Sequence, residues 1–221
     1  SLVLNMLFKA RVRHLFVFVL LFISLGTLPA CAYERVISLA PNITEMIYLL
    51  GAEDKLVAVT EACTYPIAAQ KKASTGPFGN PSIEKIAALE PDLVLYVDVK
   101  DPDFAKKIKT LNIPILQISI LNFADLQWQL LKIGALLGKK GKAQGQVNMW
   151  QQSLRAAKER SDSKRPIRVY FEFWQDPPIS VGGKSFIDEI IKLAGGVNIL
   201  VSENKSYVKP NEESIIAMDP E

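Results

Sequence analysis

Few side chains suited to chemistry remain once the first 32 residues are set aside as a leader. The chain has one His, at position 14, and two Cys, at positions 31 and 63. Without the leader, Cys63 is the single thiol and no histidine is left. We therefore expect no zinc or manganese site of the usual nitrogen and sulfur ligands, no internal disulfide and no histidine-based catalysis. We also expect no other bound metal and no cofactor. Carboxylate catalysis stays open, although no paired Asp or Glu motif is present.

Aromatic side chains stand where strands are expected to end. In open α/β sheets, ligands bind outside the carboxyl ends of the strands. Two facing lobes with aromatic rings at these ends would form a flat-walled, mostly apolar cleft. The alternative is that each ring only fills the core of its own lobe, since aromatics dominate core burial. The candidate ligand-binding residues are Phe78, Tyr96, Phe173, Trp174 and Tyr207.

One segment occurs twice along the chain, in residues 81–92 and 210–221. Self-similarity at such a distance favours two related lobes over a solenoid of short repeats. A weaker match at an offset of 144 relates residues 45–51 to 189–195. At a constant offset of 129, the identical pairs are Pro81/Pro210, Glu84/Glu213, Ile86/Ile215, Ala88/Ala217 and Pro91/Pro220.

Glu84 and Glu213 are the repeated residues that carry charge. Each falls in the expected first turn of a helix that follows a proline. A carboxylate there stabilises the positive end of the helix dipole, which is one interpretation. The other is that the two carboxylates form a pseudo-symmetric pair that docks a symmetric partner.

The N-terminal part is typical of a signal peptide. Basic residues precede an unbroken apolar run at 15–23, which is too short to span a bilayer. Residues 28–31 are similar to a lipid-attachment motif at Cys31, but simple cleavage is favoured. We expect a signal peptide at 1–32 and a periplasmic protein.

The net charge argues against nucleic acid as a partner. The leader holds three of the 26 Lys and Arg and none of the 23 Asp and Glu, so the remainder is neutral. Nucleic-acid binding would need a basic face.

The remainder alternates between strand and helix patterns, which predicts parallel sheets covered by helices. A helix from about 143 to 160, long enough to bridge two lobes, is predicted by an apolar stripe at spacings of 3 and 4: Ala143, Val147, Trp150, Leu154 and Ala157. Residues 161–166 are expected to break it. We expect an α/β fold with an N-terminal lobe at 33–122, a helical linker at 123–162 and a C-terminal lobe at 163–221. The second repeat stops at Glu221, where its strand should begin, so we expect the second lobe to be truncated. Strands are expected at 35–39, 56–59, 93–97, 114–118, 167–171 and 197–201, with helices at 42–50, 104–111, 123–137 and 185–194.

Several stretches together resemble one protein family. Residues 35–45, Arg-Val-Ile-Ser-Leu-Ala-Pro-Asn-Ile-Thr-Glu, are similar to the opening of periplasmic binding proteins for cobalamin and ferric siderophores. Residues 83–86 and 89–94 also match, as do Pro177-Pro178 with Gly195-Gly196. The resemblance covers residues 34–221 and is greatest to the members that bind cobalamin.

The resemblance implies a function as well as a fold. It implies two α/β lobes joined by one long helix, with a metal chelate held between them and delivered to the permease of an ABC importer. The positions matching Glu84 and Glu213 contact permease arginines in the family, and those matching Phe78, Phe173 and Tyr207 line the corrin site. We expect a monomer that binds cobalamin, ahead of a ferric siderophore or haem. An exported enzyme on this scaffold and a surface adhesion module are the competing interpretations.

Overall fold

The structure is a computed structural model that describes residues 32–162 and 165–221. The chain divides into two units, residues 1–32 and 33–221. The expected signal peptide and the lipid-attachment motif at Cys31 lie outside the described residues. The predicted break after the long helix falls partly on residues 163 and 164, which are not described either.

The first lobe is built on a five-stranded parallel sheet with the strand order β3-β2-β1-β4-β5. Alternation of short apolar strands with helices produces this arrangement, because parallel strands need a crossover between them. The strands are β1 (Val36–Ser38), β2 (Leu56–Val59), β3 (Ala73–Ser74), β4 (Leu93–Tyr96) and β5 (Ile115–Gln117).

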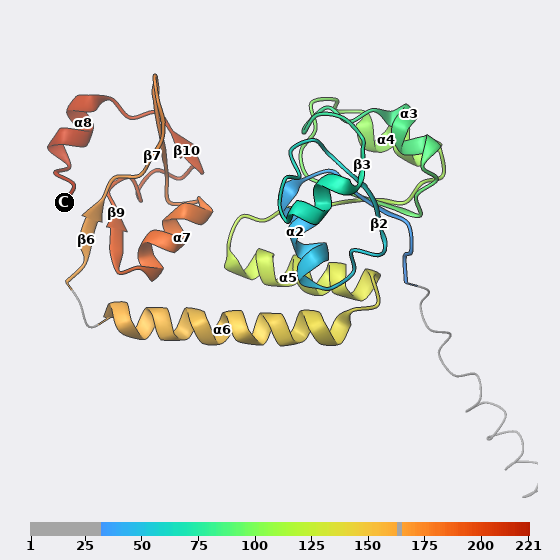
Figure 1. Cartoon of the computed structure of the whole chain (residues 1–221). Helices are drawn as coiled ribbons and strands as arrows, with labels where there is room; N and C mark the ends of the chain where they lie inside the picture. Colours follow the sequence, from blue (N-terminus) through green and yellow to red (C-terminus); the bar gives the residue numbers. More distant parts are fainter. Residues whose placement is uncertain (1–31, 163–164) are drawn as a thin grey trace, which may run out of the picture. The chain divides into compact units, whose positions relative to one another are not determined.

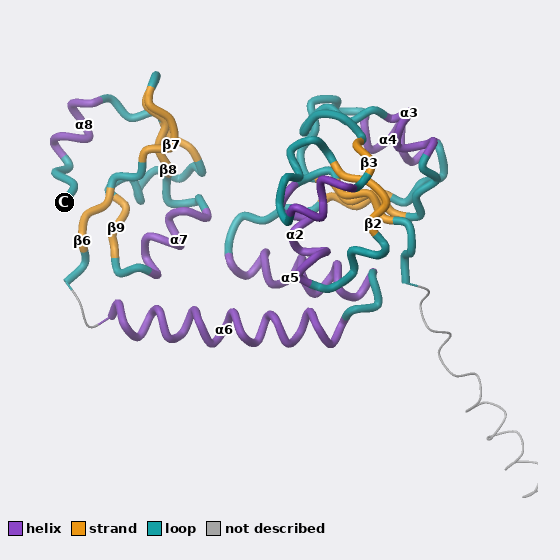
Figure 2. The backbone as a smooth tube through the Cα atoms, viewed as in Figure 1, coloured by secondary structure: helices purple, strands orange, loops and turns teal. Residues whose placement is uncertain are grey.

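Helices cover both faces of this sheet (Figure 2). Successive residues of a strand point to opposite faces, so Val36 packs in one core cluster and Ile37 in the other. Ile43 of α2 (Pro41–Leu49) packs with Val36, and Phe104 of α4 (Phe104–Thr110) packs with Ile37. Two shorter helices, η1 (Ile67–Lys71) and α3 (Ile83–Ala88), complete the lobe.

The start of α2 differs from the prediction. Its N-cap is Ala40 without a side-chain hydrogen bond, and Pro41 occupies the first turn, where proline needs no N–H partner. Thr44 lies within the helix, and its Oγ1 is 2.8 Å from Ser38 Oγ and 3.2 Å from Cys63 Sγ. The helix therefore begins earlier, and Thr44 is a buried residue of the core.

Two helices form the linker, α5 (Phe123–Leu136) and α6 (Lys140–Asp162) (Figure 1). The 23 residues of α6 give it a length of roughly 35 Å at 1.5 Å per residue. Gly138 separates the two helices with a φ of 72°, a conformation that favours glycine. A Cβ on Gly134 would lie 2.5 Å from the Cβ of Ala143, so the missing side chain is what lets α6 approach α5 closely.

The second lobe holds two small sheets. β6 (Ile167–Val169) pairs in parallel with β9 (Gly196–Asn198), as the alternation predicts. Between them the chain forms an antiparallel sheet of β7 (Glu172–Gln175), β8 (Pro178–Val181) and β10 (Tyr207–Val208). The lobe also contains α7 (Phe186–Leu193) and α8 (Glu212–Ala217).

The antiparallel sheet corrects one prediction. Phe173 and Trp174 do not follow a strand but lie within β7, where all four residues are exposed. Pro178 begins β8, a position at which a strand tolerates proline. The hairpin therefore turns at Asp176 and Pro177.

The sequence repeat is present in the structure as two equivalent helix starts. Ser82 caps α3 by accepting a hydrogen bond from Lys85 N at 3.2 Å. Asn211 caps α8 by accepting one from Ser214 N at 2.7 Å. Both pairs obey the offset of 129 found in the sequence.

The equivalence continues after each helix. Glu90 and Asp219 adopt positive φ values of 47° and 48°, and an arginine binds the carbonyl of each. Arg35 Nε lies 3.0 Å from Glu90 O, and Arg168 Nε lies 2.6 Å from Asp219 O. The duplicated segment thus makes the same turn and the same arginine contact in both lobes.

Burial predicts which isoleucines hold the first lobe together. Ile37 is fully buried, whereas Ile67 is 75% exposed. Ile37→Ala should lower the free energy of unfolding by about 2–5 kcal/mol, because it removes buried methyl groups and leaves a cavity. The matched Ile67→Ala should change it by less than about 0.5 kcal/mol. Urea unfolding followed by circular dichroism measures both, and equal losses would contradict the assigned core.

Candidate functional site

The second lobe carries an exposed aromatic patch, formed by Phe173, Trp174 and Tyr207. Their side chains are 56%, 60% and 58% exposed. The ring centroids of Phe173 and Tyr207 lie 5.3 Å apart with the ring planes tilted by 54°. Three large apolar rings left in solvent on one lobe are unusual for a purely structural role and are typical of a binding surface.

The local backbone explains how this aromatic patch arises. The pairing of β7 with β8 shifts register between Glu172 and Trp174, which leaves Phe173 without a partner strand residue. Such a bulge re-aims a side chain and is common beside binding sites. Trp174 is held by its own hairpin, because its Nε1 donates to Asp176 O at 3.0 Å. Tyr207 comes from β10, where it pairs with Val181 on the other side of β8.

Two cavities adjoin the aromatic patch. One of about 480 Å³ is lined by residues 172–176 of the β7–β8 hairpin. The other, of about 550 Å³, includes Tyr207, Val208 and residues of α8 and the preceding loop. Because Phe173 contacts Tyr207, the rings lie where the walls of the two cavities meet.

The two aromatic candidates of the first lobe, Phe78 and Tyr96, differ in their exposure and packing. Phe78 is 48% exposed and lies in a loop between two glycines with positive φ, Gly76 and Gly79. Tyr96 ends β4, is partly buried, and its ring centroid lies 5.9 Å from that of Phe104 in the core. Among the described residues, no ring contact joins either side chain to the second-lobe patch. Their role as ligand contacts remains a prediction.

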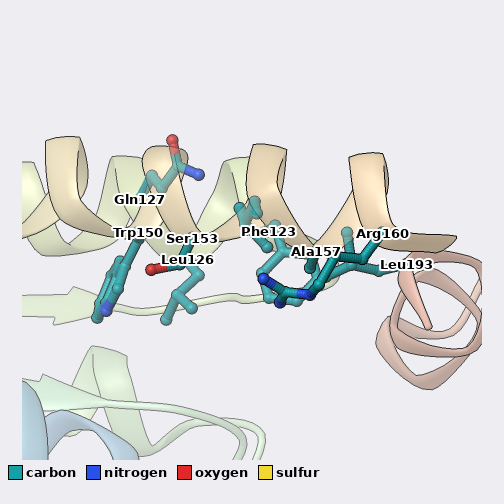
Figure 3. A pocket seen from close by; sticks show the side chains of 9 residues that line it. Phe123, Leu126, Gln127, Trp150, Ser153, Ala157, Arg160 and Leu193 are labelled. Carbon is teal, nitrogen blue, oxygen red and sulfur yellow. The ribbon is translucent and has the colours of Figure 1, made fainter. Parts of the chain in front are cut away.

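A third cavity, which the sequence did not reveal, lies along the linker (Figure 3). Its volume is about 370 Å³ and its wall is mainly apolar. Trp150, Ala157 and Arg160 line it from one side of α6, while Leu193 of α7 contributes from the second lobe. Trp150 belongs to the predicted apolar stripe, so the periodicity identified the residue but only as a packing position. Phe123, Leu126, Gln127, Ser153 and Leu154 complete the lining.

A neighbouring cavity lies on the first-lobe side of the linker cavity. Its volume is about 430 Å³, and it shares Leu126 and Trp150 with the linker cavity. It is also lined by Glu45 of α2 and by Tyr65, which is 68% exposed. Residues of both lobes and of the linker therefore line these two neighbouring cavities.

A direct contact joins the second lobe to the start of α5. The backbone N of Phe123 donates to Glu189 Oε2 at 2.7 Å, so a carboxylate of α7 stabilises the N-terminus of α5. The rings of Phe123 and Phe186 meet at 4.7 Å between centroids. These two contacts link α7 and α5 beside the linker cavity.

Tyr170 is a further candidate that the sequence did not reveal. It directly follows β6, and its hydroxyl is buried without a hydrogen-bond partner among the described residues. Burial and repulsion by Glu172 raise the pKa of this hydroxyl, so it stays protonated as a donor. Because an unpaired buried hydroxyl costs free energy, we regard Tyr170 as a candidate donor to a bound molecule.

The two repeated glutamates occupy equivalent, exposed positions. Glu84 is the second residue of α3 and Glu213 the second residue of α8. Ser82 Oγ donates to Glu84 Oε2 at 2.7 Å, and this bond lowers the pKa of Glu84 together with a backbone hydrogen bond. Glu84 therefore keeps its charge at lower pH than an ordinary glutamate.

The described residues offer little for metal binding. Among them, no three or more His, Cys, Asp and Glu side chains come together as a metal site. Cys63 is free and buried, and its sulfur is enclosed by Thr44 and Thr60 at 3.2 and 3.3 Å. In the same part of the chain, no helix combines the length and the apolar character needed to cross a membrane.

The ring contact in the patch predicts a measurable coupling. Phe173→Ala and Tyr207→Ala, alone and combined, form a double-mutant cycle in urea unfolding. We expect a coupling of about 0.5–1.5 kcal/mol, the usual value for an aromatic pair. The matched cycle of Trp174→Ala with Tyr207→Ala should give almost none, because the structure records no ring contact there. Equal coupling in both cycles would refute the pairing.

Comparison with known proteins agrees with this architecture. The vitamin B12-binding proteins of Vibrio parahaemolyticus and Yersinia pseudotuberculosis are 29% and 30% identical to this chain over 202 and 204 residues. The matches cover 91% and 92% of this chain and 74% and 73% of those proteins.

The solved structures of similar proteins confirm the two-lobed α/β fold. The periplasmic vitamin B12 binding protein BtuF of Vibrio cholerae matches with a TM-score of 0.74 and 28% identity, over 85% of this chain and 74% of that one. The periplasmic haem binding protein HutB of Vibrio cholerae matches with a TM-score of 0.76 and 27% identity, over 84% and 73%. A family model for periplasmic binding proteins matches residues 36–221. The chain therefore belongs to the periplasmic binding protein family and is a substrate-binding protein, not an enzyme.

Proposed function

We propose that this protein captures cobalamin or a related corrinoid between its two lobes in the periplasm. The observation that carries the proposal is the exposed aromatic patch of Phe173, Trp174 and Tyr207. A corrin is a broad, nearly planar ring, and stacking it on aromatic side chains removes apolar surface of both partners from water. The vitamin B12-binding proteins at about 30% identity support the same ligand.

The first lobe supplies the opposing wall in this proposal. Phe78 is exposed on a glycine-flanked loop and can reach a ligand without unpacking the core. Tyr96 contributes less, because its ring already packs against Phe104. The aromatic contacts of the first lobe would therefore come mainly from Phe78.

Haem is the second candidate ligand. The likeness to a haem binding protein at 27% identity favours it, and a porphyrin is also flat enough for the patch. A ferric siderophore is the third alternative, and it is less planar than either ring system. In all three, the metal is already held by the chelating molecule.

We further propose that the loaded protein, as a monomer, delivers its ligand to the permease of an ABC importer. Glu84 and Glu213 are exposed, occupy equivalent helix positions in the two lobes and lie beside matching caps. A pair of carboxylates with this pseudo-symmetry is complementary to two symmetry-related arginines on a two-fold partner.

Titration calorimetry tests the ligand. We expect one-to-one binding of cyanocobalamin, and Phe173→Ala or Tyr207→Ala should weaken it by about 10-fold or more, because aromatic anchors dominate binding surfaces. Trp128, which is 65% exposed and lines none of the cavities described above, provides the control, and Trp128→Ala should leave the affinity nearly unchanged. No heat with cyanocobalamin but tight binding of haemin would replace the corrinoid with haem and leave the family unchanged.

Charge reversal tests the docking. Glu84→Arg and Glu213→Arg should leave the ligand affinity intact but abolish uptake in vesicles containing the permease, because like charges at an interface cost several kcal/mol. The double variant should be worse than either single one. Glu159→Arg, on the exposed side of α6, is the matched control and should transport normally. Normal uptake by the double variant would contradict the docking role and leave both glutamates with the stabilisation of their helix N-termini alone.

A further inference from the structure

Two lysines flank Tyr207 along the strand at the edge of the antiparallel sheet. Lys205 precedes Tyr207 by two residues and Lys209 follows it by two, and both lysines are exposed. Lys205, Tyr207 and Lys209 all line the cavity of about 550 Å³. The rim of the aromatic patch is therefore cationic on both sides of Tyr207.

The charge of this rim is not neutralised by the protein. Within residues 32–162 and 165–221, neither Lys205 nor Lys209 forms a salt bridge, whereas Lys192 of the same lobe pairs with Asp188 at 2.6 Å. Glu203 is the one acid among the described residues lining the cavity. Glu212 and Glu213 stand nearby on α8 but do not line it. The cavity therefore carries a net positive charge.

The lysines adjoin the stacking surface. Tyr207 contacts Phe173 at 5.3 Å between ring centroids, and both lysines line the same cavity as Tyr207. Their flexible side chains can therefore reach the edge of a flat molecule stacked on these rings. A lysine is a compact charge on a flexible stem and adapts to an anionic oxygen at such an edge. Hydrogen bonds between an ammonium group and an anionic oxygen are stronger than neutral ones.

We propose that Lys205 and Lys209 are specificity-determining residues that bind an anionic oxygen group, phosphate or carboxylate, on the rim of the planar ligand. This inference rests on the proposed function, because it takes the aromatic patch as the stacking surface. The protein should therefore select among flat chelates by whether they carry an anionic group at their edge. Cobalamin offers the phosphodiester of its nucleotide loop and haem offers two carboxylates, while cobinamide has neither group.

The test uses calorimetry with the full chain and three probes: cyanocobalamin, dicyanocobinamide and haemin. Cyanocobalamin and haemin carry an anionic group and are called the anionic probes. The wild-type protein should bind one of them more tightly than dicyanocobinamide. The double variant Lys205→Gln with Lys209→Gln should bind that anionic probe roughly 10- to 100-fold more weakly, as expected for lost charge-assisted hydrogen bonds. The affinity of the same double variant for dicyanocobinamide should equal that of the wild type. Raising the ionic strength should weaken wild-type binding of the anionic probe and have little effect on the variant.

A control variant removes two lysines elsewhere. Lys140 and Lys158 are exposed on α6 and line none of the cavities described above, so their double change to Gln matches the loss of net charge. It should bind every probe like the wild type. Unchanged affinity of the Lys205/Lys209 variant for the anionic probes would overturn the inference while the proposed corrinoid function stands.

The remaining outcomes are equally informative. Lysine-dependent binding of haemin without binding of cyanocobalamin would support the inference and replace the proposed ligand. Binding of dicyanocobinamide as tight as that of cyanocobalamin, with no effect of the lysines, would support corrinoid binding and refute the anion contact. Binding of none of the probes would overturn both.

Discussion

The close packing of α6 at both of its ends is the constraint on which the rest of residues 33–221 depends. No sheet is shared between the lobes, so helix packing must connect them. Near its start, Ala143 of α6 meets Gly134 of α5, where a Cβ would lie only 2.5 Å away. Near its end, Ser161 meets Gly195, where an added Cβ would lie 3.0 Å away. Gly195 also has a φ of 88°, so a larger residue would be strained there in any case.

This packing has a consequence for the candidate site. The linker cavity is lined by α5, α6 and α7, and Glu189 and Phe186 of α7 hold Phe123 at the start of α5. The same helices therefore join the lobes and form the wall between them. A molecule in this space contacts helices, while the aromatic patch lies on β7 and β10 of the second lobe.

The duplicated segment gives the two lobes equivalent helix starts and equivalent turns after each helix. Arg35 and Arg168 each bind the carbonyl of a residue with positive φ, and matching caps precede the helices. Fixing the turn after each helix also fixes the direction in which each helix begins. Glu84 and Glu213 are thereby presented alike, which is the geometric basis of the proposed docking to a two-fold partner.

The sequence by itself determined the local elements and their class. Apolar runs predicted the parallel strands, the stripe from Ala143 to Ala157 predicted the long helix, and the repeat singled out Glu84 and Glu213. These features depend on residues close together in the chain or on identical residues at a fixed offset. The aromatic residues were found from their types, although their places in the strands were partly wrong.

Only the tertiary structure decided what these side chains face. Phe173 and Tyr207 are brought together because β7 and β10 both pair with β8, and the ring of Phe173 is exposed like the other residues of β7. Tyr96 instead packs against Phe104, although its local pattern resembles that of the exposed aromatics. Exposure depends on which distant strand or helix covers a residue, and periodicity along the chain carries no information about that pairing. For the same reason the charged rim around Tyr207 and the cavity beside Trp150 emerged only from the folded chain.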